Sequence, residues 1–215
     1  MIKQFTFNHF EENTYIVYNE QKDAALVDVG CAAKAEEDAL YAYIKSENLN
    51  IKYLLLTHAH IDHFCGMADA SKYFNLPITM HKDGTKLFDI FTVQAPNMGF
   101  EAVDMSQVKF NYVQYDSEIK LSEDYVFKIL DASGHCPGSI AYYDVKDKAV
   151  FCGDAIFHMS IGRTDLYGGD LDVLLANIKK NILTLPEDTL LMCGHGQTSD
   201  IAYEKNNNPY VIDFR

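Results

Sequence analysis

Short apolar runs separated by turn residues dominate the first half of the chain. The runs are rich in β-branched and aromatic residues, a composition typical of β-strands. We expect strands over Lys3–Asn8, Thr14–Tyr18, Ala24–Val29, Ile51–Leu56 and Pro77–Met80. Apolar residues recur at helical spacing over Ala33–Glu47 and Ala68–Phe74, which predicts helices there. Asp83–Phe91 is a further candidate helix, and Ala95–Phe100 has the composition of a loop.

The second half shows the same kinds of run. We expect strands over Tyr125–Asp131, Ser139–Val145, Lys148–Cys152 and Thr189–Met192. Lys146 and Asp147 would form the turn that joins Ser139–Val145 and Lys148–Cys152 in a β-hairpin. Leu171–Leu183 has helical periodicity with Asp170 as a candidate N-cap, and a short helix is expected after Ser199. A length of 215 residues suits a single domain, residues 1–215, with two halves sharing one core as the alternative.

The densest polar signal follows the apolar run Tyr53–Leu56. It reads Thr57-His58-Ala59-His60-Ile61-Asp62-His63. Imidazole and carboxylate groups are ligands that zinc and iron accept. Positions two apart point the same way in an extended turn, so His58 and His60 can reach one ion together. Asp62 and His63 begin the next helical stretch and can face a second ion.

Three more candidate ligands, His135, Asp154 and His195, also stand shortly after predicted strands, and each is preceded by glycine. Glycine permits unusual backbone angles and close approach of the chain. We therefore expect four strand ends to deliver seven metal ligands to one edge of a sheet. The remaining histidines, His9, His81 and His158, are expected to be ordinary hydrogen-bonded groups.

Composition narrows the classes of function. The formal net charge of -13 disfavours nucleic acid as a partner, although bound cations would reverse the local field near a metal site. No apolar run approaches the roughly 20 residues of a membrane span, and the first residues lack the apolar stretch of a signal peptide. We therefore expect a cytoplasmic protein that binds no membrane. The cysteines, at positions 31, 65, 136, 152 and 193, show no CxxC spacing, and we expect free thiols that are mostly buried.

The motif over residues 57–63 resembles the signature of the metallo-β-lactamase superfamily. Gly134-His135, Gly153-Asp154 and Gly194-His195-Gly196 are similar to its later ligand motifs and come in the expected order. The resemblance spans nearly the whole chain. It implies an α+β fold, the four-layer αβ/βα sandwich in which two sheets pack face to face with helices outside. It also implies the ligand sets: His58, His60 and His135 for one metal ion, Asp62, His63 and His195 for the other, and Asp154 as the bridge.

The segment Ser160–Asp170 is similar to the corresponding stretch of glyoxalase II-like hydrolases, as are Glu204-Lys205 and Asn208-Pro209. Few residues follow His195, so the similarity is to the short, single-domain branch. Glyoxalase II proper has an added C-terminal helical domain that helps to hold glutathione. The resemblance implies a small-molecule thioester substrate, with S-2-hydroxyacylglutathione as the candidate. It implies two divalent metal ions, zinc first, with iron and manganese as alternatives.

The implied chemistry is hydrolysis by a metal-bridging hydroxide. Two ions about 3.5–4 Å apart can share a hydroxide at neutral pH, and this hydroxide would attack the thioester carbonyl. Catalytic roles would then fall to His58, Asp62 and Asp154, with Asp62 also orienting the hydroxide. No nucleophilic serine or cysteine is required.

Several nearby residues carry two interpretations. For Arg163 and Asp165 we favour a buried ion pair that shapes the loop beneath the site over a catalytic role. Within Phe91–Met105, the residues Pro96, Met98 and Phe100 could form an apolar wall for the substrate or belong to a plain surface insertion. Lys205 could meet an anionic end of the substrate or be solvated. Cys65 and Cys136, which adjoin ligands, are expected to pack rather than to bind metal.

Other functions compete with thioester hydrolysis. The alternative is persulfide oxidation by a single iron held by His58, His135 and Asp154, a reaction of relatives with a similar Gly-Arg-Thr-Asp segment. Retention of every ligand of the second ion disfavours it. β-Lactam hydrolysis is disfavoured by the glyoxalase-like segment and the absence of a secretory signal. RNA processing is disfavoured by the negative net charge of the chain. A non-enzymatic metal-binding or redox module would need the ligands without a substrate pocket.

Overall fold

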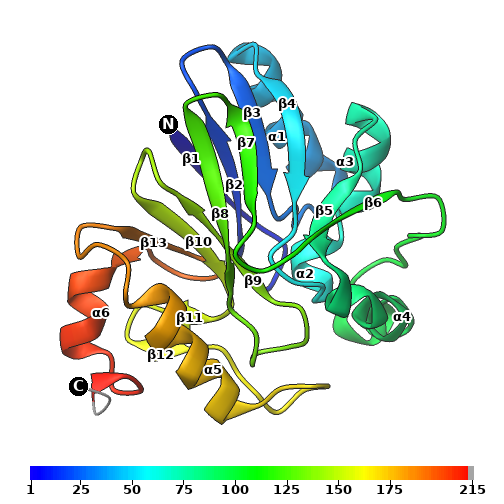
Figure 1. The fold of residues 1–215 in the computed structure, drawn as a ribbon. Coiled ribbons are helices and arrows are strands. Elements are labelled where there is room, and N and C mark those ends of the chain that lie inside the picture. Colours follow the sequence, from blue (N-terminus) through cyan, green and yellow to red (C-terminus); the bar gives the residue numbers. More distant parts are fainter. Residues whose placement is uncertain (213–215) are drawn as a thin grey trace. The chain divides into compact units, whose positions relative to one another are not determined.

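The computed structural model of the chain describes residues 1–212 (Figure 1). The chain forms two compact units, one of residues 1–80 and 85–112 and one of residues 81–84 and 113 onward. Each unit carries a six-stranded sheet within the described residues. The expectation of a single domain over residues 1–215 stays a prediction, and its last three residues lie outside the described part. No helix of residues 1–212 is long and apolar enough to cross a membrane.

The sheet of the first unit is mixed. In sheet order, its strands are β1 (Ile2–Phe7), β2 (Glu12–Tyr18), β3 (Asp23–Val27), β4 (Asn50–Leu55), β5 (Ile78–His81) and β6 (Phe110–Val113). The helices of this unit are α1 (Lys34–Ser46), α2 (Ile61–Phe64), α3 (Met67–Phe74), α4 (Thr85–Gln94) and the 3₁₀ helix η2 (Ala95–Met98). Strands β3, β4 and β5 run parallel, and parallel neighbours need long crossover connections. Helix α1 crosses from β3 to β4, and α2 with α3 crosses from β4 to β5.

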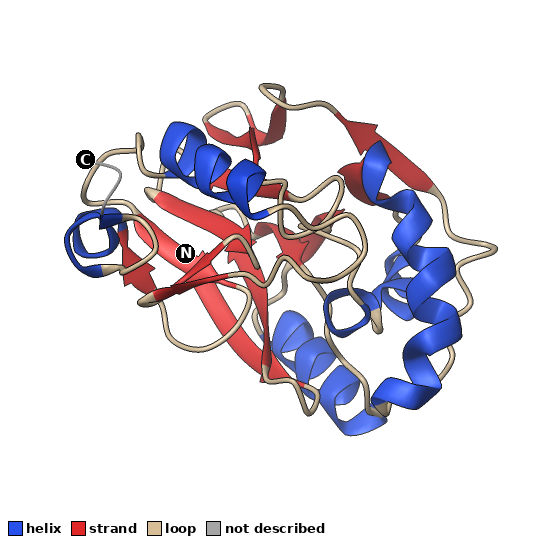
Figure 2. Ribbon diagram, turned by 90° about the horizontal axis from the view of Figure 1, so that it is seen from below, coloured by secondary structure: helices blue, strands red, loops and turns tan. Residues whose placement is uncertain are grey.

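The second unit has its own sheet. In sheet order, its strands are β14 (Ser199–Asp200), β13 (Leu190–Cys193), β10 (Ala149–Gly153), β9 (Ile140–Asp144), β8 (Tyr125–Asp131) and β7 (Glu118–Ser122). The remaining elements are the 3₁₀ helix η1 (Lys82–Gly84), the hairpin of β11 (Ile156–Phe157) and β12 (Ser160–Ile161), α5 (Leu171–Asn177), the π-helical turn η3 (Ile178–Ile182) and α6 (Ile201–Asn207). Figure 2 shows these helices in blue beside the red strands.

A hydrophobic core joins the helices of the second unit to its sheet. Leu174 of α5, Ile178 of η3 and Ile201 of α6 are fully buried in one cluster with Val150 of β10 and Leu191 of β13. Full burial of such a side chain contributes about 1.5–3 kcal/mol. This packing places α5 and α6 beside the strands whose ends carry candidate ligands.

The strand ends correct one sequence prediction. The seven candidate ligands do not follow strands of one sheet: the four of residues 58–63 follow β4 of the first sheet, and His135, Asp154 and His195 follow β8, β10 and β13 of the second. Strands β8 and β10 are both antiparallel to β9, and β10 is parallel to β13. The carboxyl ends of β8, β10 and β13 therefore meet at one edge, which explains why three distant residues gather there.

The other elements agree with the sequence closely. Each predicted strand is present with its ends shifted by at most two residues. Asp170 caps α5 by accepting a hydrogen bond from the Val173 amide, as predicted. The predicted turn at Lys146 and Asp147 is also present, and both backbone amides donate to the Asp144 carboxylate at 3.0 and 3.1 Å.

The differences are local. Strands β6, β7, β11, β12 and β14 were not predicted. The predicted helix over Leu171–Leu183 widens into the π-helical turn η3 after Asn177. There, the amides of Asn177 and Asn181 reach the loop before His135: Asn177 Nδ2 donates to the Ser133 carbonyl at 3.0 Å and Asn181 Nδ2 to the Asp131 carbonyl at 2.8 Å.

Candidate metal centre

The first unit gathers four candidate ligands just beyond β4. His58 and His60 lie in the extended segment that leads into α2, and Asp62 and His63 lie in its first turn. All four side chains are buried. The ring centroid of His58 is 4.8 Å from that of His60 and 4.1 Å from that of His63, and His63 Nε2 is 3.6 Å from Asp62 Oδ2. This geometry brings the four predicted ligands close together, and their binding of metal ions stays a prediction.

A carboxylate behind the cluster orients two of its imidazoles. Asp28, which follows β3, accepts hydrogen bonds from the Thr57 amide at 2.7 Å, from the Thr57 hydroxyl at 2.7 Å and from His63 Nδ1 at 2.8 Å. Because the Thr57 hydroxyl proton points to Asp28, its oxygen accepts from His58 Nδ1 at 3.1 Å. Both rings therefore carry the proton on Nδ1 and present the lone pair of Nε2, which is the arrangement of metal-binding histidines.

A second buried acid, Glu12, lies behind His63. Its side chain is completely buried, accepts from the Thr14 hydroxyl at 2.8 Å, and lies 4.0 Å from His63 Nδ1. Burial raises the pKa of Glu12 well above its ordinary value. Gly30 makes room for it, since a Cβ there would lie 2.0 Å from Glu12 Oε2.

The second unit gathers the other three candidates. Asp154 Oδ2 lies 3.7 Å from His135 Nε2 and 3.6 Å from His195 Nε2, so one carboxylate stands between two imidazoles. His135 Nδ1 donates to the Arg163 carbonyl at 2.7 Å, which leaves Nε2 facing Asp154. The Gly194 amide donates to the Gly153 carbonyl at 2.8 Å and ties together the turns that carry Asp154 and His195.

Both clusters fit a divalent metal ion. Two ligand atoms about 2.1 Å from an ion in tetrahedral geometry are separated by about 3.4 Å. The nitrogen–oxygen distances of 3.6 and 3.7 Å in the two clusters are close to this separation. Burying so many polar groups is costly unless they are paired or bind an ion. The donor set therefore supports metal binding.

The ion pair of Arg163 and Asp165 differs from the sequence prediction. Arg163 donates to both carboxylate oxygens of Asp165 at 2.7 Å, but the two side chains are 61% and 67% exposed. The expectation of a buried pair is therefore wrong. The hydrogen bond from Arg163 lowers the pKa of Asp165 to about 2. Arg163 reaches His135 through its backbone carbonyl instead, and a backbone contact leaves no signature in the side-chain pattern.

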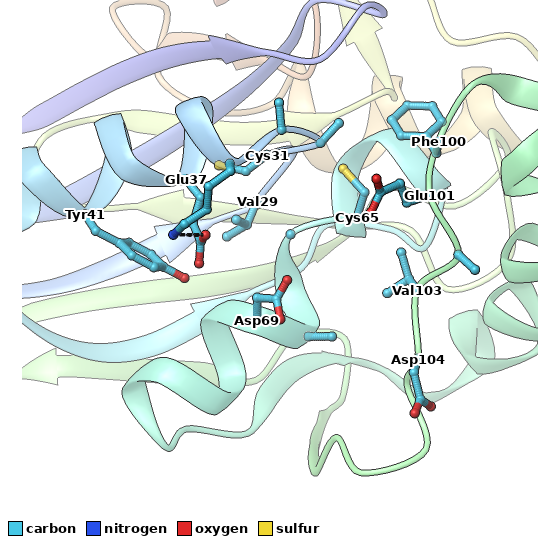
Figure 3. Close-up of a pocket in the computed structure, with 16 residues that line it drawn as sticks. Val29, Cys31, Glu37, Tyr41, Cys65, Asp69, Phe100, Glu101, Val103 and Asp104 are labelled. Carbon is cyan, nitrogen blue, oxygen red and sulfur yellow. Dashed lines mark hydrogen bonds and ion pairs between the residues drawn. The ribbon is translucent and has the colours of Figure 1, made fainter.

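The candidate substrate residues lie in different settings. Phe100 is buried, and its ring lies 4.7 Å from His9 and 5.4 Å from Phe10. It lines a cavity of about 430 Å³ together with Cys31 and Cys65 (Figure 3). The Met98 carbonyl accepts from His9 Nε2 at 2.9 Å. Lys205 lies on α6 with Nζ 3.8 Å from Glu187. The ring of Phe91 lies 4.7 Å from that of the candidate ligand His60.

The remaining cysteine and histidine predictions concern packing. All five cysteines are free, and all but Cys65 are buried, as expected. Burial, with nearby carboxylates, raises the pKa of Cys31 and Cys65 above the ordinary thiol value, so both stay protonated. His81 stacks on Tyr115, and His158 stacks on Tyr203.

Sequence reasoning missed Glu12 and Asp28. Asp28 lies near the end of a predicted strand, but it is preceded by Val27 and not by the glycine that precedes His135, Asp154 and His195. Glu12 lies at the start of β2 and carries no comparable signal.

Comparison with known proteins supports this picture. A family model for the metallo-beta-lactamase superfamily matches residues 8–195. Hydroxyacylglutathione hydrolase GloC of Haemophilus influenzae is 32% identical to the chain, over 94% of the chain and 93% of the relative. The solved structure of BLEG-1 B3 metallo-beta-lactamase has a TM-score of 0.86 at 33% identity, covering 98% of this chain and 99% of that one. That of TTHA1623 in a di-iron-bound form has a TM-score of 0.85 at 30% identity, with coverages of 97% and 99%.

These matches confirm the predicted α+β fold class with its two main sheets. The superfamily binds metal ions and includes hydrolases, in keeping with the histidine and aspartate clusters of both units. The family match covers both units of the chain and spans every candidate ligand. The chain therefore belongs to the metallo-β-lactamase superfamily.

Proposed function

We propose that this protein hydrolyses a small-molecule thioester, of the S-2-hydroxyacylglutathione type, with two divalent metal ions. The observation that carries the proposal is the pair of clusters, one buried and one partly exposed, in which imidazole and carboxylate atoms stand 3.6–3.7 Å apart and the oriented histidines present Nε2. In the proposal His58, His60 and His135 hold one ion, Asp62, His63 and His195 hold the other, and Asp154 bridges them.

The relatives favour this reading over a single-ion enzyme. GloC is named a hydroxyacylglutathione hydrolase and matches almost end to end. The TTHA1623 structure is described as di-iron-bound, which supports two ions of zinc, iron or manganese in this chain. The alternative, persulfide oxidation by one iron, leaves His60, Asp62, His63 and His195 without a role.

The chain's own residues prepare the site for hydrolysis. Bound divalent ions would lower the pKa of water and polarise the substrate carbonyl. Asp28, Thr57 and the Arg163 carbonyl hold the Nδ1 protons of His63, His58 and His135, so that these rings act as neutral ligands. In this proposal Asp62 would also accept a hydrogen bond from the attacking water.

Metal analysis combined with turnover tests the proposal. The purified protein is expected to hold two ions per chain and to release thiol from an S-2-hydroxyacylglutathione. His60→Ala should lower kcat/KM by at least about 100-fold, because it removes a ligand. His9→Ala, whose ring is hydrogen-bonded to the Met98 carbonyl, is the matched control and should retain activity.

Two results would overturn the proposal. One is a single iron per chain, with oxygen uptake on a persulfide and no thiol release from thioesters. The other is faster turnover of a β-lactam than of any thioester, the activity that the name of the BLEG-1 structure describes for that protein.

A further inference from the structure

The carboxylate of Glu204 is completely buried in α6, outside the ligand clusters. Its Oε2 accepts from the Met159 amide at 3.0 Å and from Asn208 Nδ2 at 2.8 Å. Its Oε1 accepts from the Ser199 hydroxyl and lies 3.4 Å from His158 Nδ1. A buried carboxylate is tolerated only when it is this fully hydrogen-bonded, so the arrangement demands an explanation.

Two of the partners of Glu204, His158 and Met159, form the turn of the small hairpin of β11 and β12. Met159 sits in the turn of that hairpin with φ at 59°, a left-handed conformation that is unfavourable for a residue other than glycine. Asn208, one turn after Glu204, donates to the Ser160 carbonyl at 2.9 Å and to the Phe157 carbonyl at 3.4 Å. The end of α6 thus holds both sides of the hairpin turn.

The base of the same hairpin holds two of the candidate ligands. The hairpin begins two residues after Asp154, and its base is closed by the Gly162 amide, which donates to the Ala155 carbonyl at 3.2 Å. Gly162 lies so close to this turn that a Cβ there would stand 1.8 Å from the Asp154 carbonyl oxygen and 3.1 Å from His135 Nδ1. The next residue, Arg163, supplies the carbonyl that accepts from His135 Nδ1.

We infer that Glu204 is a positioning residue for the metal cluster of the second unit. With Asn208, it fixes the hairpin turn, and the hairpin base then fixes the backbone of Asp154 and the acceptor that orients His135. The inference rests on the proposed metal site, but not on the identity of the substrate.

Glu204→Gln is the sharpest variant, because it keeps the shape of the side chain. Oε2 faces two N–H groups that can only donate, so an amide nitrogen there would replace an acceptor by a donor, and the change also removes the negative charge that the neighbours of both oxygens meet. Glu187→Gln is the matched control: it removes a carboxylate that is 75% exposed and lies 3.8 Å from Lys205 of α6, and it leaves the hydrogen bond from the Ala202 amide to the Glu187 backbone carbonyl in place.

The metal-free proteins are titrated with Co²⁺ in competition with a chelator, and the visible absorption of the bound cobalt is recorded. Glu204→Gln is expected to bind Co²⁺ about 10–100-fold more weakly and with a changed spectrum, as for other partners of metal ligands. Asn208→Ala removes the other side chain of α6 that holds the hairpin turn, and it should also weaken Co²⁺ binding and change the spectrum. If Glu204→Gln does not fold, Asn208→Ala provides the test of the inference. Glu187→Gln should match the natural protein.

A purely structural role gives a different result. A folded Glu204→Gln protein with a lower urea midpoint but unchanged cobalt affinity and spectrum would overturn the inference. If the natural protein binds Co²⁺ but cleaves no thioester, the proposed substrate is wrong, and the cobalt comparison still tests the role of Glu204.

Discussion

Single residues show how the cluster of the first unit is prepared before any ion arrives. Asp28 accepts three hydrogen bonds and sets the protonation of His63 directly and of His58 through Thr57. A charged acceptor makes such hydrogen bonds shorter and stronger. Removing the negative charge of Asp28 should therefore disturb the orientation of the His58 and His63 rings more than it disturbs the packing of the core.

Asp28→Asn tests this at the residue scale. Asn tolerates the left-handed backbone of position 28, whose φ is 54°, so the change leaves the backbone unstrained while it removes the charge and replaces one accepting oxygen by a donor. We expect metal affinity to fall about 10–100-fold. Long-range proton–nitrogen NMR spectra of the His63 ring should show the Nδ1-protonated form losing population. Asp38→Asn, which changes an exposed acid of α1, is the control. Unaltered His63 nitrogen shifts in Asp28→Asn would contradict the assigned role.

The candidate ligands themselves could be predicted from the sequence, whereas their supporting residues could not. Three histidines and an aspartate within residues 58–63 are close in space because they are close along the chain. Asp28 is 35 residues from His63, and Glu204 is 45 residues from Met159. No local periodicity records partnerships over such distances, because the fold alone brings them together.

At the scale of elements, tight turns between strands and helices aim the ligands. Gly134 precedes His135 with φ at 121°, and a Cβ there would lie 2.3 Å from the backbone nitrogen of Leu174 in α5. Its carbonyl accepts from the Asp170 amide at 2.7 Å, just where α5 begins. The close approach of this turn to α5 therefore requires glycine.

Gly134→Ala is predicted to destabilise the protein strongly. The left-handed backbone alone costs about 1–3 kcal/mol for a residue with a side chain, and the overlap with α5 adds to this cost. Gly196→Ala is a matched control, because Gly196 also has a positive φ of 70° but a Cβ there would meet nothing within 4 Å. Urea unfolding of the two variants measures the difference. Equal losses of unfolding free energy in the two variants would show that the overlap with Leu174 adds nothing to the cost of Gly134→Ala.

For the whole molecule, the acidic balance and the metal clusters act on stability together. The net charge is -13, and the negative side chains behind it repel one another in the compact state. This repulsion lowers the stability of the folded state, and buried carboxylates lower it further. Divalent cations that bind only the folded chain shift the equilibrium toward it.

Metal removal is therefore expected to lower the thermal midpoint. A cation at 100 times its Kd stabilises the folded state by about 2.7 kcal/mol, and chelation should abolish this contribution. Adding Zn²⁺ back should restore the midpoint in the natural protein and in His9→Ala, which changes a histidine outside the ligand clusters, but only partly in His195→Ala. Calorimetry with and without chelator makes the comparison. Identical midpoints in the two conditions would mean that no ion stabilises the fold.

The sequence by itself determined the fold class, nearly every longer strand and helix, and the residues that can bind metal. The elements follow from local periodicity, the candidate ligands from the chemistry of a few side chains at short spacing, and the fold class from the resemblance of these motifs to those of the metallo-β-lactamase superfamily. The tertiary structure alone decided that the ligands follow strands of two sheets, that Arg163 and Asp165 form an exposed pair, and that Glu12, Asp28 and Glu204 lie buried. Burial and long-range pairing depend on which surfaces the folded chain brings together, and a one-dimensional pattern does not contain that information.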